Sequence, residues 1–233
     1  MMKKRLFFCA FFLFLFTGFI YLALDQVKIQ HLKKITYDIA KSEYFNTIIE
    51  SANTRKKQST IRIRVTLADQ YDDLKLIDQF AVFEFLNRQI RYDLLTKDFE
   101  NPFYNNDFEI IGQTSSNNYR YSNPVSHKQL AENAESIFQK NGYDVYNRRT
   151  FKNEFYKKYS PNIQEFTVLK YAEKMFSLIS SGGKYHNHHS DSIVIYDAVE
   201  KRFGITKQEY DNIFRKYHLG MDYLPSIQID ASK

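Results

Sequence analysis

The chain opens on an uninterrupted apolar run, Leu6 to Leu24, and turns polar directly after it. The run has no charged residue and follows the basic stretch MMKKR at 1–5. About 19 helical residues rise ~28 Å, close to the ~30 Å hydrocarbon core of a bilayer. A helix buried in a soluble core would keep a polar face, and this one has none. The pattern predicts an N-terminal transmembrane helix within residues 1–24.

This segment is either an uncleaved signal anchor or a cleaved secretory signal peptide, because both begin with basic residues followed by apolar ones. A cleaved signal usually has an apolar stretch of ~7–15 residues that ends at small residues. Here the apolar run is longer. The nearest candidate site, Tyr21-Leu22-Ala23, also places a large aromatic residue where a small one is needed. We therefore expect a signal anchor, with cleavage as the alternative.

Basic residues are almost evenly balanced across the span, so the positive-inside rule discriminates weakly. They are Lys3, Lys4 and Arg5 before it, and Lys28, Lys33 and Lys34 after it. A short N-terminal tail and a long following domain are typical of a signal anchor. We therefore expect a single-pass protein of the cell membrane, with residues 25–233 extracytoplasmic.

The pattern after the span is first helical and then alternating. Apolar residues at helical spacing predict a stalk over 27–52, with an amphipathic helix on the bilayer as the alternative. The polar stretch NTRKKQST at 53–60 predicts a linker. Alternation then predicts a strand that carries Ile61, Ile63, Val65 and Leu67.

The next ninety or so residues predict a small α+β domain. A helix that carries Leu76 to Leu94 is followed by a hairpin over 107–122. The capping box of Ser126 and Gln129 predicts a second helix, through Phe138 to a stop at Asn141-Gly142. A short strand over 143–146 completes the order β-α-β-β-α-β, which is that of the ferredoxin-like fold.

Helical spacing predominates from about residue 150, with start signals at Ser160-Pro161 and at the capping box of Thr206 and Glu209. The fold class expected is α+β with a C-terminal helical bundle. The expected regions are a transmembrane anchor (1–24), a helical stalk and linker (25–59), an α+β domain (60–150), a helical domain (151–220) and a loose tail (221–233).

Composition and charge change this picture little. The net charge of +6 arises from 33 basic residues that are offset by 27 acidic ones, as on an ordinary solvated surface. The single cysteine, Cys9, lies in the apolar span, so no intramolecular disulfide is possible. The folded part must therefore be held together by its core.

The clearest candidate for metal chemistry is a histidine loop, in which His186, His188 and His189 precede Asp191. Imidazoles and a carboxylate are ligands of zinc and similar ions. The spacing H-x-H-H is not a standard ligand set, and neighbours in an extended loop point in different directions. A solvated loop between helices therefore accounts for these residues, and no motif implies a cofactor.

Two patterns suggest nucleic-acid binding. The stretch VEKRFGIT at 199–206 resembles a helix-turn-helix, whose second helix would enter the major groove. Glu200 replaces the small residue usual there, and the second helix has few basic residues early. Strand residues also interleave arginines with tyrosines, as in single-strand binders, but a solvent face of an amphipathic sheet explains them: Arg62, Arg64, Tyr119, Arg120 and Tyr121.

Residues 165–217, which include KYAEKMFSLISSGGKY, resemble helical modules at the C-termini of uncharacterised Gram-positive envelope proteins. This resemblance implies an extracytoplasmic location and no catalytic residue. Together with the span it favours a non-enzymatic, membrane-anchored protein that binds an envelope protein or polymer. The alternatives are a membrane-tethered metal-dependent hydrolase that uses the loop His186–His189 and a membrane-tethered DNA-binding regulator.

The uncleaved anchor makes a direct prediction. The mature protein should retain residues 1–24 and stay in the membrane pellet through carbonate extraction, because the span lacks an acceptable cleavage site. Intact-mass analysis of the purified protein measures this. Loss of the first ~20–25 residues would show that the segment is a cleaved signal.

Overall fold

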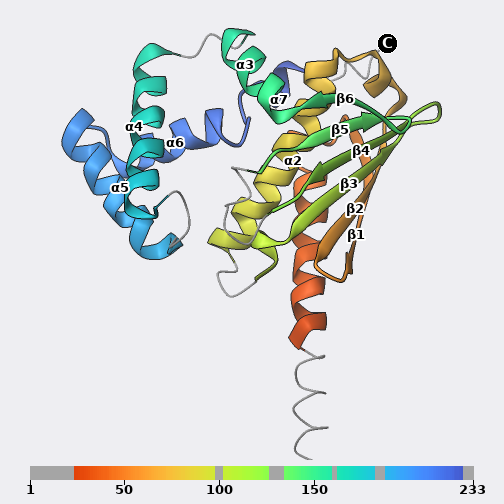
Figure 1. The fold of residues 1–233 in the computed structure, drawn as a ribbon, viewed down its shortest axis with the longest axis horizontal. Helices are drawn as coiled ribbons and strands as arrows, with labels where there is room; N and C mark the ends of the chain where they lie inside the picture. Colours follow the sequence, from red (N-terminus) through yellow and green to blue (C-terminus); the bar gives the residue numbers. More distant parts are fainter. Residues whose placement is uncertain (1–23, 98–101, 126–133, 159–161, 182–186, 228–233) are drawn as a thin grey trace, which may run out of the picture.

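The computed structural model describes residues 24–97, 102–125, 134–158, 162–181 and 187–227. The expected span Leu6 to Leu24 lies outside these residues except for its last one. Within the described part, no helix combines the length and the apolar character that crossing a membrane requires. The predicted α+β class is confirmed, because six strands form one sheet and helices pack against it (Figure 1).

The strands follow one another across the sheet in sequence order, from β1 at one edge to β6 at the other. Only β2 and β3 pair in parallel, joined by the long crossover helix α2 (Leu76–Thr96). The strands are β1 (Ile49–Lys57), β2 (Thr60–Leu67), β3 (Asp107–Gln113), β4 (Asn118–Asn123), β5 (Ile137–Lys140) and β6 (Tyr143–Asn147). Short 3-10 turns flank α2 at Asp69–Asp73 and Pro102–Asn105.

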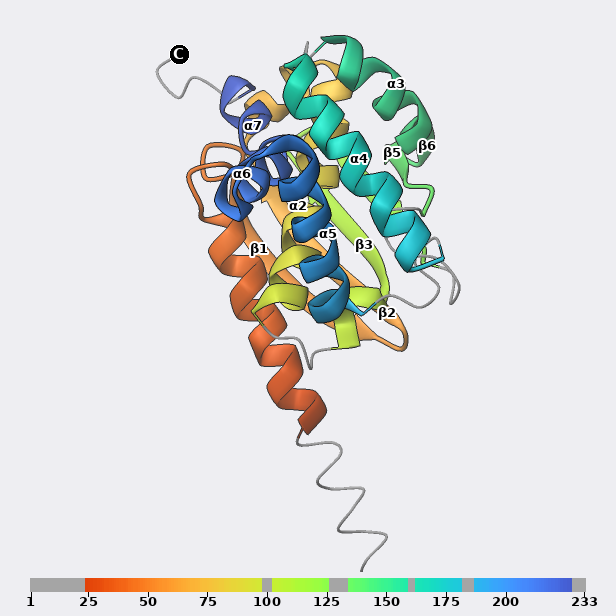
Figure 2. The same cartoon turned by 90° about the vertical axis from the view of Figure 1, so that its left-hand side faces the viewer.

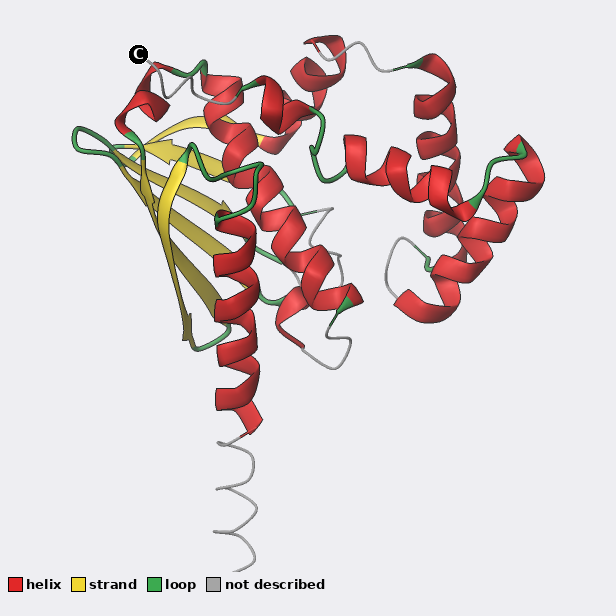
Figure 3. Cartoon of the chain, turned by 180° about the vertical axis from the view of Figure 1, so that it is seen from behind, coloured by secondary structure: helices red, strands yellow, loops and turns green. Residues whose placement is uncertain are grey.

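The main core lies between one face of the sheet and two helices. A helix over residues 24–40 buries Leu32, Ile35 and Ile39 there, and α2 is buried along most of its length. Figure 3 shows both helices in front of the sheet when it is seen from behind. No helix among the described residues covers the opposite face of the sheet.

The predicted stalk and linker are wrong beyond residue 40. The helix ends there, and 53–60 belongs to the β1–β2 hairpin, whose turn includes Gln58 with a φ of 55°. Because β1 is an edge strand, its inner face needs little apolar surface, and Ala52 and Thr54 supply part of it. The alternation is therefore almost invisible in the sequence.

The ferredoxin-like order is also wrong, because the expected second helix is replaced by β5 at Ile137–Lys140. Asn141 and Gly142 have φ values of 52° and 86°, which form a tight hairpin turn rather than a helix stop. The observed order is β-β-α-β-β-β-β. The capping box predicted at Ser126 and Gln129 lies outside the described residues.

The helical character of the C-terminal part is confirmed. Thr206 and Glu209 form the predicted capping box, and Gly204 ends the preceding helix with a φ of 67°. The N-cap of α4 is Asn162, whereas the predicted Ser160-Pro161 start lies outside the described residues. The helices are α3 (Arg148–Lys158), α4 (Ile163–Ile179), α5 (His188–Phe203), α6 (Lys207–Tyr217) and α7 (Tyr223–Ser226).

These helices divide between two cores. Helices α4, α5 and α6 share a small cluster of their own, and Figure 2 shows them in front of α2, on the side away from the sheet. Helix α3 belongs to the main core through Phe151 and Phe155. The expectation of a loose tail is wrong up to residue 227, because Tyr223, Leu224 and Ile227 are buried in the main core.

Phe80 on α2 should be a stability determinant. Its side chain is fully buried, and its ring centroid lies 5.1–6.1 Å from those of four aromatic neighbours: Tyr121, Phe138, Tyr146 and Phe151. Phe80→Ala should lower the free energy of unfolding by ~3–5 kcal/mol. Tyr143→Ala, at a side chain that is 75% exposed, is the control and should change it by less than ~0.5 kcal/mol. Denaturant unfolding of the full chain measures both changes. Equal losses of unfolding free energy in the two variants would contradict the central place of Phe80 in the core.

Candidate functional site

The uncovered face of the sheet carries a group of charged side chains on β1 to β4. We call this group the arginine face and define it as Arg55, Arg62, Arg64, Glu109 and Arg120. The register places Arg55 opposite Arg62 and Arg62 opposite Glu109. Arg64 and Arg120 lie on either side of Ile111 in the next row. Strands are ~4.8 Å apart and alternate residues ~6.7 Å apart, so the arginines are close neighbours.

Glu109 is the centre of the arginine face. Its carboxylate pairs with the guanidinium groups of Arg62 and Arg120 and is only 7% exposed. Arg62 and Arg120 themselves remain 31% and 54% exposed. The Glu109 carboxylate therefore fixes the positions of two arginine side chains on the sheet and neutralises one of their two positive charges.

Arg55 and Arg64 carry the remaining positive charge. Both side chains are exposed, and neither has an ion-pair partner among the described residues. Guanidinium groups stay protonated at any physiological pH and present donors that match carboxylate or phosphate oxygens in a bidentate way. These five side chains hold four cations against one anion and are suited to an anionic partner. Asp107 lies on the same face, where its carboxylate accepts from the Val125 backbone N–H.

The tyrosines that the sequence interleaves with these arginines point the other way. Tyr119 and Tyr121 are buried against the core, whereas Arg120 between them is exposed. The interpretation of these five residues as one solvent face is confirmed for Arg62, Arg64 and Arg120 and is wrong for Tyr119 and Tyr121. Stacking of nucleic-acid bases needs aromatic rings on the same face as the cations, and these two rings are on the opposite face.

A buried polar network lies on the inner side of the sheet, around Glu84 of α2. The Glu84 carboxylate accepts from Arg88 and Arg148 at 2.7 Å each and from the Tyr121 hydroxyl at 2.7 Å. Burial by itself raises the pKa of Glu84, but the neighbouring Arg148 and Arg88 and the Tyr121 bond bring that pKa down to about 2. The network joins α2, α3 and β4, so it is a structural centre.

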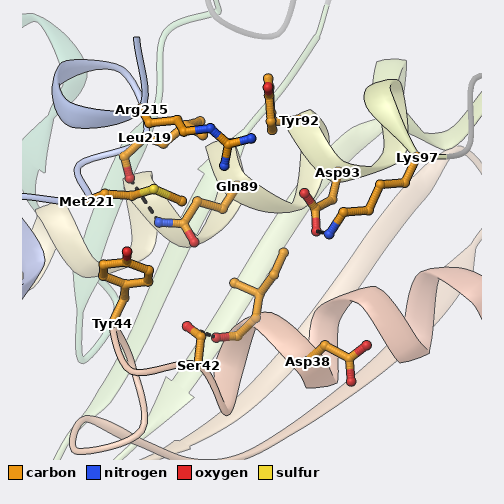
Figure 4. Close-up of a pocket in the computed structure, with 11 residues that line it drawn as sticks. Asp38, Ser42, Tyr44, Gln89, Tyr92, Asp93, Lys97, Arg215, Leu219 and Met221 are labelled. Carbon is orange, nitrogen blue, oxygen red and sulfur yellow. Dashed lines mark hydrogen bonds and ion pairs between the residues drawn. The ribbon is translucent and has the colours of Figure 1, made fainter. Parts of the chain in front are cut away.

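The junction between the two cores contains a cavity of about 220 Å³, which Figure 4 shows. Several of its polar groups are bonded within the protein. Asp93 pairs with Lys97 at 2.6 Å, and the Gln89 amide donates to the Leu219 carbonyl at 2.9 Å. Arg215 lies over the Tyr92 ring at 5.5 Å. The lining therefore links α2 to the helical unit, by which we mean α4, α5 and α6. It places no nucleophilic side chain beside a general base.

The histidine loop is only partly within the described residues. His186 lies outside them, His188 begins α5, and His189 is exposed. The Asp191 carboxylate accepts from the Asn187 backbone N–H at 2.9 Å, which is a helix-capping contact. Among the described residues, no group of three His, Cys, Asp or Glu side chains is placed to hold a metal ion.

The stretch that resembles a helix-turn-helix does form two helices, α5 and α6, joined by residues 204–206. The cations of α6 are held by neighbours within the protein. Lys207 lies 4.6 Å from the Tyr196 ring centroid, and Lys216 pairs with Glu165 at 2.9 Å. With Arg215 over Tyr92, these contacts favour a packing role for α6 over phosphate binding.

Comparison with known protein families, with curated proteins and with solved structures finds no match for this chain. The resemblance of residues 165–217 to envelope modules therefore stays an expectation. Sequence reasoning missed Arg55 and Glu109 of the arginine face. The sequence gives little signal for Arg55, because Lys56 and Lys57 follow it and hide the alternation of β1.

The Glu84 network predicts acid sensitivity. Because the folded-state pKa of Glu84 lies below its ordinary value of 4.5, its contribution to stability is complete above pH 4.5 and is lost as the pH falls toward about 2. Glu84→Gln should cost ~3–5 kcal/mol at pH 7, because Arg88 and Arg148 lose their buried partner. Unfolding free energies from pH 2 to pH 7 measure both effects. An unchanged pH dependence in the variant would contradict this account.

Proposed function

We propose that this chain is a membrane-anchored, extracytoplasmic binding protein of the cell envelope, with the arginine face as its binding surface. The apolar run Leu6 to Leu24 is the proposed anchor. Its last residue is the first described residue of the helix 24–40, which packs into the main core through Leu32, Ile35 and Ile39. An anchor continued by that helix would hold the folded part in a fixed orientation.

The observation that carries the proposal is the uncovered sheet face with four arginines and one central carboxylate. Glu109 pairs with Arg62 and Arg120, whereas Arg55 and Arg64 are exposed and have no ion-pair partner among the described residues. A partner that presents carboxylates or phosphates along an extended surface fits this chemistry. No contact among the described residues favours the metal-dependent hydrolase or the DNA-binding regulator over this proposal.

The arginine face predicts a charge-specific loss of binding. Arg64→Gln with Arg120→Gln should weaken binding of an anionic polymer roughly tenfold at low salt, because two exposed charge contacts are lost. The matched control removes the same charge from exposed lysines of the helical unit, through Lys174→Gln with Lys201→Gln. Full-length protein in neutral nanodiscs, titrated with polyphosphate and with polyglutamate, measures both affinities.

The control variant should bind like the wild type. Equal weakening by both double variants would mean that net charge alone matters and that the arginine face is not a site. Capture from the native membrane with wild-type and Arg64/Arg120 variant proteins then identifies the partner as the species that the variant loses. Recovery of the same species by both proteins would contradict the proposal.

A further inference from the structure

The tip of the β1–β2 hairpin is tied to the first turn of the helix 24–40. The Lys56 ammonium group donates to both carboxylate oxygens of Asp25, at 2.8 and 3.0 Å. It also lies 4.8 Å from the ring centroid of Phe103, whose side chain is buried. Figure 1 shows the hairpin turn beside the lower part of this helix. The contact joins residues that are 31 positions apart in the chain.

Asp25 directly follows Leu24, the last residue of the proposed membrane span. The polar headgroup regions add several ångströms on each side of the ~30 Å hydrocarbon core, to a total of ~40–45 Å. A residue that begins one position after the span lies at the inner boundary of that region. Because Lys56 is bonded to Asp25, the hairpin tip must lie close to the same level.

The chemistry of the tip suits a negatively charged surface. Arg55 and Lys57 are exposed on either side of Lys56, and the stretch 51–68 contains no aspartate or glutamate. Leu24 and Val27 are 55% and 66% exposed at the same end of the helix, which is where apolar side chains meet the bilayer interface. Cations and apolar side chains therefore gather at one end of the fold.

We infer that the β1–β2 hairpin tip, with Lys57 and Arg55, contacts anionic phospholipid headgroups at the bilayer surface from which the folded part emerges. This inference rests on the proposed anchor. The tip and helix 24–40 then form two points of attachment, which together fix the tilt of the sheet. In this orientation the strands run away from the membrane surface. Arg55 and Arg62 are then the residues of the arginine face nearest the headgroups.

A purely structural explanation exists for the same cations. Edge strands often carry lysines and arginines that prevent pairing with other chains, and β1 is an edge strand. That explanation predicts no dependence on lipid charge. The two accounts are therefore separated by changing the lipid around the intact protein.

The experiment places a fluorescent label at Ser59→Cys in a Cys9→Ala background of the full chain. The matched label is at Ser116→Cys in the β3–β4 turn, at the opposite end of the sheet. Nanodiscs contain either phosphatidylcholine or an equal mixture with phosphatidylglycerol, each with a headgroup-labelled quencher lipid. We expect several-fold stronger quenching at 59 than at 116 in the anionic discs. The contact equilibrium should fall ~5-fold for each cation removed by Lys57→Gln and Arg55→Gln.

Two results would overturn the inference, and they are distinguishable. In the first, the chain enters nanodiscs, but quenching is equal at 59 and 116 or quenching at 59 does not depend on lipid charge. This result would contradict the headgroup contact and leave the proposed anchor standing. Failure of the wild-type chain to enter nanodiscs removes the proposed anchor and this inference with it. The Lys174→Gln and Lys201→Gln variant should leave quenching at 59 unchanged.

Discussion

Glu84 is a single buried carboxylate that three elements share. Arg88 comes from the same helix, Arg148 from the start of α3 and Tyr121 from β4, and all three donate to its two oxygens. The Tyr121 hydroxyl also lies 2.9 Å from Ser136, which Asn123 contacts in turn. A charge with no exposure is stable only where such partners are in place, so the packing of α2, α3 and the sheet is mutually dependent.

This arrangement is consistent with helices that cover one face of the sheet and leave the other face uncovered. Helix α2 is buried toward the sheet and is also covered by α7, whose Tyr223 hydroxyl donates to Asp78. The turn after α6 covers it as well, because Arg88 and Gln89 donate to the backbone carbonyls of His218 and Leu219. Every long helix of the main core lies on that side. The other side of the sheet is therefore left to polar side chains, and the arginine face occupies it.

The sequence patterns that were predicted correctly are those with a complete local signal. The strand at Ile61 to Leu67, the long helix after it and the capping box at Thr206 depend on neighbours in the chain. Strand β1 was missed because an edge strand buries little. Strand β5 was missed because Ile137 and Phe138 also fit helical spacing, and only pairing with β4 decides between the two.

The same limit applies to the candidate site. Arg62, Arg64 and Arg120 stand out in the sequence as cations on strands, and alternation is enough to place them on a solvent face. Glu109 does not stand out, because its position beside Arg62 follows from a parallel register across residues 47 positions apart. Asp72, in the 3-10 turn before α2, likewise accepts from Thr114 and Asn117 in the distant β3–β4 turn. Contacts between residues this far apart in the chain leave no pattern in the neighbouring sequence.

The burial of Tyr223, Leu224 and Ile227 in the main core has a consequence for how the protein is made. Synthesis runs from the N-terminus, and the parallel pairing of β2 with β3 already has to wait for the α2 crossover. The core beneath α2 is then closed only by the last few residues of the described chain. A chain still emerging from the ribosome therefore holds an unfinished main core until residues 223–227 are available to pack. A chain truncated before residue 223 would lack the Tyr223 ring, which contacts both Phe85 and Phe155.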